Sequence, residues 1–402
     1  HARRAAGRTR RRVNVVPLAT HSVRALRDTL RAHGWEAEPA DAAAGGAEPL
    51  ALHLTGLDDP ALEALVRYAG RLGLDVHTGD GWAILSGTRW RLGAFARPWT
   101  APPALAEVAT RVGLAIPADA SPAWLTARGA LPLDEPVLVG ILNVTPDSFS
   151  DGGRYGAVDA ARAQADRLVA DGARVVDVGG ESTRPGRDDP VPEAEELSRV
   201  LPVIRALAAD HPDLVISIDT VKSGVARAAL GEGAAVINDV SGFRLDPAMA
   251  EVAAAGRAGV VLMHSRGAIT EISSYTHADY GSDVTGAVLF ELAEAVAAAV
   301  AHGVGPEAIV VDPGLGFSKT PEQSALICDR LAAFRALGRP ILVGPSRKRF
   351  LGAVAGIEAP AERDRATGVV CALAWERGAR LFRVHDVATT REALAVARGI
   401  GG

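Results

Sequence analysis

The chain has 402 residues, of which 48% are apolar and 23% are charged, and its formal net charge is −5. This length fits two domains, this balance is typical of a soluble globular protein, and the small negative charge gives no basis for a nucleic-acid partner. No uninterrupted apolar run approaches the ~18 residues of a membrane-spanning helix, so we expect no membrane association. Cys328 and Cys371 lack metal-ligand spacing, which indicates reduced thiols in a cytoplasmic protein.

Residues 1–12 form a basic segment. Its six arginines are followed by no apolar segment of the kind found in secretory signals. We expect a solvated, disordered arm here, and a targeting presequence is the alternative.

Residues 13–98 predict a small α+β domain. Four expected strands and two expected helices give roughly the order βαβαββ of ferredoxin-like domains. No catalytic constellation is evident in this region. The composition changes after the Pro- and Ala-rich stretch 98–122, so we expect a connecting segment over 99–134. The expected strands are 13–18, 49–56, one near 74–78 and one over 82–96, and the expected helices are 21–33 and 60–73.

Residues 135–402 alternate near-continuous apolar strands with helical patterns. Strands that are apolar on both faces belong to parallel sheets covered by helices. Eight such units favour a closed (β/α)8 TIM barrel, and a doubly wound open sheet is the alternative. The expected strands are 137–144, 174–180, 214–219, 234–239, 259–264, 308–314, 340–346 and 379–386, with helices for example at 158–171, 193–209, 284–302 and 321–337.

Every expected barrel strand ends in a polar or titratable side chain. In a TIM barrel these strand ends form the catalytic face. One strand-end Asp can simply cap the next helix, but the same pattern on eight strands indicates a single site. The residues are Asn143, Asp177, Glu181, Asp219, Asn238, Asp239, His264, Asp312, Ser346, Arg347, Lys348, Arg383, His385 and Asp386.

Four of these residues suit a heterocycle. Asp219, Asn238 and Asp312 could face a ring rich in N–H donors, because ionised carboxylates accept hydrogen bonds and an amide does both. Lys348 could donate to ring oxygen or nitrogen atoms. Only three of the 43 basic residues are lysines, and each of them follows an expected strand end, which supports a special need for an ammonium group there.

An anion site is expected beside that ring. Arg383 and His385 lie two apart on one expected strand and so point to the same side of it. Together with Asn143 they suit an anionic leaving group such as phosphate. A Walker loop, and a G-x-G-x-x-G after the first barrel strand, are both absent from the sequence, which disfavours nucleoside triphosphates and dinucleotides.

Two loops are unusually rich in Gly, Pro and polar residues. They are 145–155, with Asp147, Phe149 and Asp151, and 181–189, with Ser182, Thr183, Arg184 and Pro185. Loops of this composition can order on binding and act as a lid. Two solvated turns are the alternative.

Seven strand-end motifs together resemble the dihydropteroate synthase family of the folate pathway. They occur in the family's order and cover about 137–400, but not 1–130. The motifs are GILNVTPDSFSDGG (140–153), GGESTRPG (179–186), SIDT (217–220), INDVSG (237–242), DPGLGFSK (312–319), GPSRKRFLG (344–352) and RVHDV (383–387).

The resemblance implies condensation of 6-hydroxymethyl-7,8-dihydropterin diphosphate with 4-aminobenzoate, by an SN1-like mechanism, to 7,8-dihydropteroate and diphosphate. It implies Mg²⁺ near Asn143, a homodimer, and inhibition by sulfonamides, which mimic 4-aminobenzoate. It also implies catalytic roles for Asp151, Arg184, Lys348, Arg383 and His385. The pterin-binding residues that the resemblance implies are Asp219, Asn238, Met263, Asp312, Phe317, Gly344 and Lys348. The implied diphosphate-binding residues are Asn143, Arg383 and His385. The implied aminobenzoate-binding residues are Phe149, Ser182, Thr183, Arg184, Pro185, Phe317 and Ser346.

One stretch departs from the family pattern. After LMH the family commonly has a further Met and a Pro-containing stretch, whereas this chain has SRGAITEISSYTHADY over 265–280. Two other functions stay open at this point. They are a pterin-binding methyltransferase that serves a corrinoid, and a non-catalytic pterin-binding relative.

Overall fold

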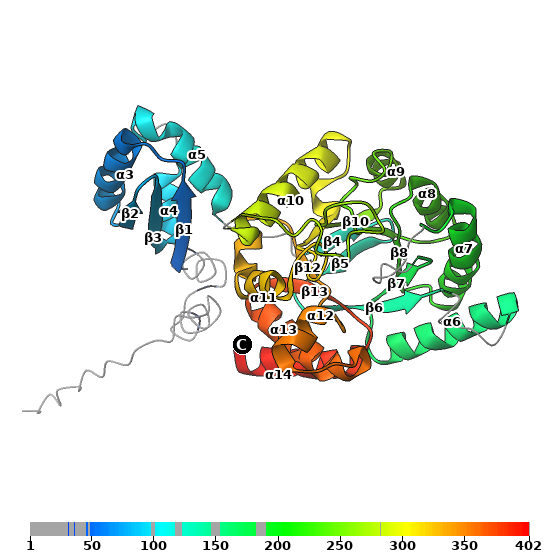
Figure 1. The fold of residues 1–402 in the computed structure, drawn as a ribbon. Helices are drawn as coiled ribbons and strands as arrows, with labels where there is room; N and C mark the ends of the chain where they lie inside the picture. The colour runs from blue at the N-terminus through cyan, green and yellow to red at the C-terminus, as the bar shows by residue number, and fades with distance from the viewer. Residues whose placement is uncertain are drawn as a thin grey trace, which may run out of the picture. The chain divides into compact units, whose positions relative to one another are not determined.

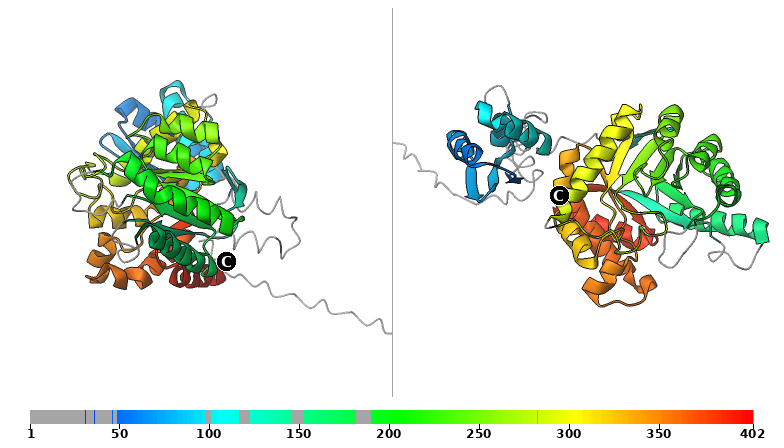
Figure 2. Two further views of the ribbon diagram at one scale, coloured as in Figure 1. Left: turned by 90° about the vertical axis from the view of Figure 1, so that its right-hand side faces the viewer. Right: turned by 45° about the horizontal axis from the view of Figure 1, so that its top comes forward.

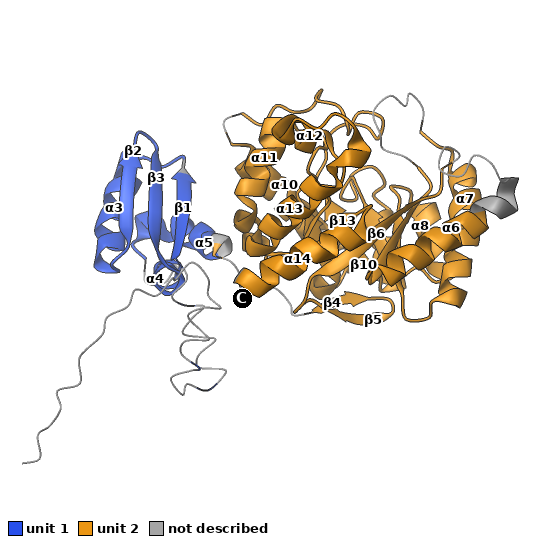
Figure 3. Cartoon of the chain, turned by 90° about the horizontal axis from the view of Figure 1, so that it is seen from below, with its two compact units in different colours: residues 1–113, 402 blue, residues 114–401 orange. Residues whose placement is uncertain are grey.

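A computed structural model describes residues 49–97, 101–116, 123–145, 153–181, 190–281 and 283–401, together with Arg31, Glu36 and Gly46. The chain divides into two compact units, one within residues 1–113 and one over residues 114–401 (Figure 3). The strand expected over 13–18 and almost all of the helix expected over 21–33 lie outside the described residues.

The N-terminal unit contains a three-stranded antiparallel sheet with strand order β1-β3-β2. Helix α3 (Asp59–Arg71) connects β1 (Pro49–Thr55) to β2 (Asp75–Gly79), and β3 (Trp82–Thr88) pairs with both strands. The strand expected over 82–96 is wrong beyond Thr88, because the Thr88 hydroxyl accepts a hydrogen bond from Arg91 N and begins α4 (Arg89–Phe95). The ferredoxin-like type stays a prediction.

The stretch 99–134 contains more than a connection. It includes η1 (Pro103–Leu105), α5 (Ala106–Ala115) and a hairpin of β4 (Ala123–Thr126) and β5 (Gly129–Pro132). The hairpin belongs to the second unit and lies at one end of the barrel (Figure 3). Its Trp124 is buried, and the indole Nε1 donates to the carbonyl oxygen of Ala308 at 2.7 Å.

The second unit is a closed barrel of eight parallel strands, which confirms the expected TIM barrel (Figure 1). Closure occurs where the last strand pairs with the first, with Leu381 opposite Val137, and this excludes the open sheet. The strands are β6 (Val137–Asn143), β7 (Val175–Gly179), β8 (Val215–Asp219), β9 (Val236–Asp239), β10 (Gly259–Met263), β11 (Ile309–Asp312), β12 (Ile341–Val343) and β13 (Ala379–Val384).

Helices surround the barrel on its outside, as the further views show (Figure 2). The helix expected over 321–337 is interrupted at Arg330, where the α-helix ends and a 3-10 helix begins. The helices are α6 (Gly153–Ala170), α7 (Glu193–Asp210), α8 (Ser223–Gly231), α9 (Met249–Gly256), α10 (Val284–Ala301), η3 (Pro306–Ala308), α11 (Pro321–Asp329), η4 (Leu331–Leu337), α12 (Arg349–Ala355), η5 (Pro360–Arg363), α13 (Asp364–Glu376) and α14 (Val387–Gly401).

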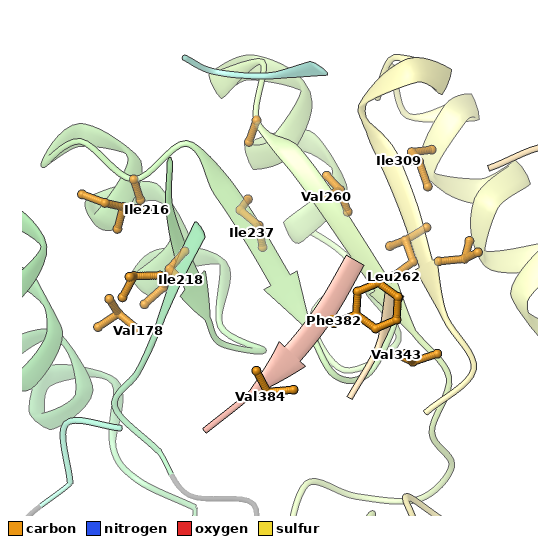
Figure 4. Close-up of a cluster of buried hydrophobic side chains, with 14 of the residues drawn as sticks. Val178, Ile216, Ile218, Ile237, Val260, Leu262, Ile309, Val343, Phe382 and Val384 are labelled. Carbon is orange, nitrogen blue, oxygen red and sulfur yellow. The ribbon is translucent and has the colours of Figure 1, made fainter. Parts of the chain in front are cut away.

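The strands bury both faces, which explains their near-continuous apolar sequences. Outward side chains such as Ile216, Ile237 and Leu262 belong to the core shared with the helices (Figure 4). Inward side chains such as Val175 and Val261 form a second cluster with Trp124 of the hairpin. The hairpin therefore covers one end of the barrel, and the carboxyl ends of the strands lie at the opposite end.

Helix α10 is long and apolar enough to cross a membrane by length and composition alone. Its Val288 and Leu292 are buried in the barrel core, and its Glu291 pairs with Arg266. It is therefore one of the covering helices of the barrel.

Candidate active site

The register of the strands brings three expected site residues into one row, with Gly179 between two of them. Asn143 on β6 is opposite Gly179 on β7, Gly179 is opposite Asp219 on β8, and Asp219 is opposite Asn238 on β9. Met263 on β10 is likewise opposite Asp312 on β11. Gly179 has no side chain, and a Cβ there would lie 3.4 Å from Asn143 Oδ1 and 3.8 Å from Asp219 Oδ2. The row therefore leaves room between an amide and a carboxylate.

Arg383 is paired with two carboxylates at the centre of this rim. Its Nε lies 2.6 Å from Asp177 Oδ2, and its Nη2 lies 2.6 Å from Asp219 Oδ2. Asn238 Nδ2 donates to the same Asp177 Oδ2 at 2.9 Å. Burial raises the pKa of Asp219 to about 7, although the Arg383 charge opposes this shift. That Arg383 and His385 bind one anion as a pair stays a prediction.

Asp177 has a larger part than its sequence position indicates. Its side chain is 1% exposed, lies one layer below the row, and accepts from both Arg383 and Asn238 through one oxygen. Its other oxygen, Oδ1, is buried without a hydrogen-bond partner among the described residues. The residue lines a cavity of about 10 Å³ in the barrel together with Ser217 and Asn238. Sequence reasoning placed Asp177 at the rim but gave it no ligand role.

Asp312 and Lys348 form the other side of the site. Asp312 is buried, and its Oδ1 accepts from Gly314 N at 2.7 Å. Burial raises the pKa of Asp312, and the charge of Lys348 opposes that shift. Burial also lowers the pKa of Lys348 to about 8, with Asp312 opposing. The two groups therefore act on each other across the pocket.

Lys348 lies against an aromatic ring and two glycines. Its Nζ is 4.2 Å from the centre of the Phe317 ring, within the range of a cation–π contact. A Cβ at Gly344 would lie 3.8 Å from Lys348 Nζ, and one at Gly316 would lie 3.2 Å from Lys348 Cδ. These glycines make the space that the lysine chain occupies. The expected grouping of Phe317, Gly344 and Lys348 is present.

Ser346 and His385 contact each other. Ser346 Oγ lies 2.9 Å from His385 Nδ1, and His385 N donates to Ser346 Oγ at 3.1 Å. The resemblance implies that Ser346 binds the aminobenzoate and that His385 binds the diphosphate. This contact therefore joins residues of the two expected subsites.

Three strand-end residues have partners within the protein. Arg347 makes a two-bond ion pair with Asp364, at 2.8 and 2.7 Å. Asp239 accepts from Ser241 N and Ser241 Oγ, both at 2.7 Å. Asp386 accepts from Thr389 N at 2.9 Å, at the start of α14. Of the three, Asp386 makes the helix-capping contact that the sequence left open as an alternative.

Glu181 takes part in a charged cluster behind the rim. Lys222 Nζ lies 2.6 Å from Glu181 Oε2 and 2.6 Å from Glu196 Oε2. Burial opposes the charge on Lys222, but the two glutamates raise its pKa. Glu181 Oε1 also accepts from Val191 N at 2.8 Å, which ties residue 181 to the start of the next described stretch. Glu196, on α7, was not singled out in the sequence because it looks like an ordinary helical acid.

Six expected site residues lie outside the described residues, and nothing is said of their structure. They are Phe149, Asp151, Ser182, Thr183, Arg184 and Pro185.

Comparisons with known proteins agree with this arrangement. Residues 139–385 match the family described as Pterin binding enzyme. Over 266 residues the chain is 48% identical to a dihydropteroate synthase of Mycobacterium leprae, covering 64% of this chain and 91% of that protein.

Two solved structures from Xanthomonas albilineans are similar to the barrel. A dihydropteroate synthase with 4-aminobenzoic acid has a TM-score of 0.65 and 42% identity, and the match covers 70% of this chain and 99% of that one. The enzyme in complex with 7,8-dihydropteroate has a TM-score of 0.61 and 41% identity, covering 68% and 96%. The similarity is therefore to nearly the whole of each of these chains.

Proposed function

The chain belongs to the pterin-binding enzyme family and is a dihydropteroate synthase, and from this premise we propose how its residues carry the reaction. The substrates are 6-hydroxymethyl-7,8-dihydropterin diphosphate and 4-aminobenzoate. The single observation that supports the assignment of roles is the row of Asn143, Asp219 and Asn238, which faces Asp312 and Lys348 across one barrel mouth.

The pterin binds between the two sides of this mouth. Asp219, Asn238 and Asp312 accept hydrogen bonds from its ring nitrogens, while Lys348 donates to its acceptor edge. Asp312 Oδ1 accepts a hydrogen bond from Gly314 N. Among the described residues this leaves Asp312 Oδ2 to accept from the ligand. Met263 lies opposite Asp312 and is buried, so it supplies an apolar floor. Phe317 and Gly344 complete the pocket.

The diphosphate lies beside Asn143, Arg383 and His385. The charge of Arg383 is balanced by Asp177 and Asp219. Binding of the pterin engages Asp219 with ring N–H groups, and we propose that this frees part of the guanidinium to face the departing diphosphate. His385 is held by Ser346 through Nδ1, which directs its Nε2 away from Ser346.

A divalent cation is compatible with the donors present. Among the described residues no group of three or more His, Cys, Asp or Glu could hold a metal, so a protein-only cage is absent there. Mg²⁺ commonly keeps several waters and takes one or two protein oxygens together with substrate phosphate oxygens. The amide oxygen of Asn143 suits that arrangement. When bound, Mg²⁺ neutralises negative charge on the diphosphate.

We propose an SN1-like reaction. The C–O bond at the exocyclic methylene breaks with its electron pair leaving on the diphosphate, and the electron-rich dihydropterin stabilises the resulting cation. Asp219 and Asp312 favour positive charge on the ring. The amine nitrogen of 4-aminobenzoate then forms the new C–N bond and loses a proton. Positioning matters more than activation here, because the amine attacks a carbon that already carries positive charge.

The aminobenzoate subsite includes Ser346 and Phe317 from the described residues. We propose that Phe149, Ser182, Thr183, Arg184 and Pro185 complete it, with Asp151 joining the two loops. Sulfonamides mimic 4-aminobenzoate and should compete for this subsite.

We propose a homodimer in the cytoplasm. Exposed apolar side chains gather on α12, α13 and α14, which suits a surface covered by a second copy. They are Val354, Val369, Leu373, Val396 and Ile400. Both cysteines are free, and burial raises the pKa of Cys328 to about 12, which suits inert reduced thiols.

A diphosphate-release assay tests the proposal. The full chain is incubated with the dihydropterin diphosphate, with and without 4-aminobenzoate, and both diphosphate and dihydropteroate are measured. We expect formation of both products only when both substrates are present. Methyl transfer without diphosphate release would instead support a corrinoid-serving methyltransferase, and binding without turnover would support a non-catalytic relative.

A further inference from the structure

Lys319 is a buried lysine that the proposed reaction does not use. Its side chain is 1% exposed. Its Nζ lies 2.9 Å from His264 Nδ1, 3.0 Å from the Phe317 carbonyl oxygen and 3.1 Å from the Gly314 carbonyl oxygen. These three acceptors are the nearest ones around Nζ, and the His264 carbonyl oxygen lies 3.4 Å away.

The loop that Lys319 holds is the one that carries the pterin pocket. The Gly314 carbonyl accepts from Lys319, while Gly314 N donates to Asp312 Oδ1. The Phe317 carbonyl accepts from Lys319, while the Phe317 ring contacts Lys348 Nζ. Lys319 thus touches the backbone of both residues that orient Asp312 and Lys348.

The loop 313–318 packs closely against the residue that follows β10, His264. Gly314 has φ +68°, and a Cβ there would overlap the His264 carbonyl oxygen. Ser318 N donates to the Ile272 carbonyl oxygen at 2.6 Å, and Ser318 Oγ donates to the Arg266 carbonyl oxygen at 2.8 Å. The loop after β11 therefore packs on His264 and on the segment 265–280, and the latter is the segment that departs from the family pattern.

His264 extends this contact to helix α10. Burial opposes the charge of Glu291, but hydrogen bonds from His264 and Arg266 lower its pKa to about 2, so Glu291 is ionised and only accepts. His264 Nε2, 3.0 Å from Glu291 Oε2, therefore carries the ring proton, and Nδ1 accepts from Lys319. Burial lowers the pKa of His264 to about 4, which agrees with a neutral ring. Arg266 Nε donates to the same Glu291 oxygen at 3.1 Å, and its guanidinium lies 3.9 Å from the centre of the Tyr280 ring. Tyr280 OH donates back to the Ser318 carbonyl oxygen at 2.9 Å.

We infer that Lys319 is a positioning residue for the pterin, and that with His264 it holds the loop 313–318 so that Asp312, Phe317 and Lys348 face the ring. The inference rests on the proposed function. It also explains why a chain with 40 arginines keeps a lysine here. A planar guanidinium cannot direct donors to three acceptors that surround a single nitrogen.

The test compares Lys319→Met with wild type in the full chain. We expect the KM for the dihydropterin diphosphate to rise about 10-fold or more, because buried acceptors lose their donor and the loop shifts. kcat should change less, since Lys319 does not touch the reacting atoms. Val203→Ala is the matched control: Val203 is a buried residue of α7, which follows the strand four positions from β11 around the barrel. It should lower the melting temperature without changing this KM.

A pair of His264 variants covers the case in which Lys319→Met does not fold. His264→Asn keeps an oxygen acceptor near the Nδ1 position, and His264→Leu removes it. We expect a KM near the wild-type value for Asn and a rise of about 10-fold for Leu.

Three outcomes would overturn the inference. A folded Lys319→Met enzyme with the wild-type KM for the pterin would do so, as would equal KM values for the two His264 variants. Absence of diphosphate release by the wild-type chain would overturn the proposed function, and the inference would fall with it. Failure of the proposed function can be told from failure of the inference, because the wild-type chain is assayed for diphosphate release before any variant is compared.

Discussion

Arg383 Nη2 lies 2.6 Å from Asp219 Oδ2. The arginine that we expect to bind the diphosphate is therefore paired with a carboxylate that we expect to bind the pterin. Arg383 Nε also lies 2.6 Å from Asp177 Oδ2. One guanidinium thus holds together two carboxylates of neighbouring strands, β7 and β8. Because a guanidinium presents several donors in one plane, it can do this where a point charge cannot.

Replacing Arg383 by Met should destabilise the protein strongly. The change leaves Asp177 and Asp219 close together without a counter-charge, and loss of one partner of a buried pair costs about 3–5 kcal/mol. Urea unfolding of wild type and variant measures this difference. Arg205→Met, which removes an exposed pair with Glu232, is the control and should leave the midpoint unchanged. Equal midpoints for Arg383→Met and wild type would contradict the buried pairing.

The pH dependence of kcat/KM should be bell-shaped. Below the Asp219 pKa of about 7 the carboxyl is protonated and stops accepting hydrogen bonds from the pterin. Above the Lys348 pKa of about 8 the amine loses its charge. Since kcat/KM reports on the free enzyme, the rate should be highest between these two values. Initial rates at constant ionic strength measure the profile.

Asp219→Asn provides the control for the acidic side of this profile. It should lower the rate and remove the acidic limb while leaving the basic limb in place. A wild-type profile that stays flat across both pKa values would show that neither group controls the pterin step.

Lys348→Met should lower kcat/KM by about 10- to 150-fold, the range for loss of a charge-assisted hydrogen bond of about 1.5–3 kcal/mol. Lys348→Arg should lose most of the activity too, because the larger planar group would have to fit against Gly316, Gly344 and the Phe317 ring. Steady-state kinetics with varied dihydropterin diphosphate measures both. Near-normal turnover in both variants would remove Lys348 from the pocket.

Gly314→Ala should lower the stability of the protein far more than Gly356→Ala, although the two glycines have nearly the same φ. Gly314 has φ +68°, and an added Cβ would meet the His264 carbonyl oxygen. Gly356 has φ +69° with nothing within 4 Å of an added Cβ, so Gly356→Ala should cost only about 1–2 kcal/mol. Thermal melts and pterin binding compare the two. Equal losses would show that backbone strain alone, and not the contact with His264, requires glycine at residue 314.

Shortened chains should separate the N-terminal unit from the barrel. A chain of residues 117–402 keeps the β4–β5 hairpin and should fold and turn over. A chain of residues 130–402 lacks Trp124, which is buried at the end of the barrel. Its loss should lower the free energy of unfolding by about 3–5 kcal/mol, as for a buried Trp→Ala change. Urea midpoints and diphosphate release measure the difference. Similar midpoints for the two chains would show that the hairpin does not stabilise the barrel.

The hydrophobic pattern was sufficient to predict the barrel and the rim. Strand and helix periodicities are local properties, and a strand buried on both faces has only a few possible surroundings. The positions of Asn143, Asp219, Asn238 and Asp312 followed from where each apolar run ends. The strand expected past Thr88 failed for an equally local reason, because a Thr that caps a helix also fits inside a strand pattern.

The sequence by itself determined the eight-unit barrel, the polar residues at its strand ends and, through seven motifs, the family. The tertiary structure alone decided which of those residues contact each other. Asp177 and Arg383 are 206 residues apart, Ser346 and His385 are 39 apart, and His264 and Lys319 are 55 apart. Such pairs depend on strand register and on the direction in which each side chain leaves its strand, and no local pattern in the chain records either.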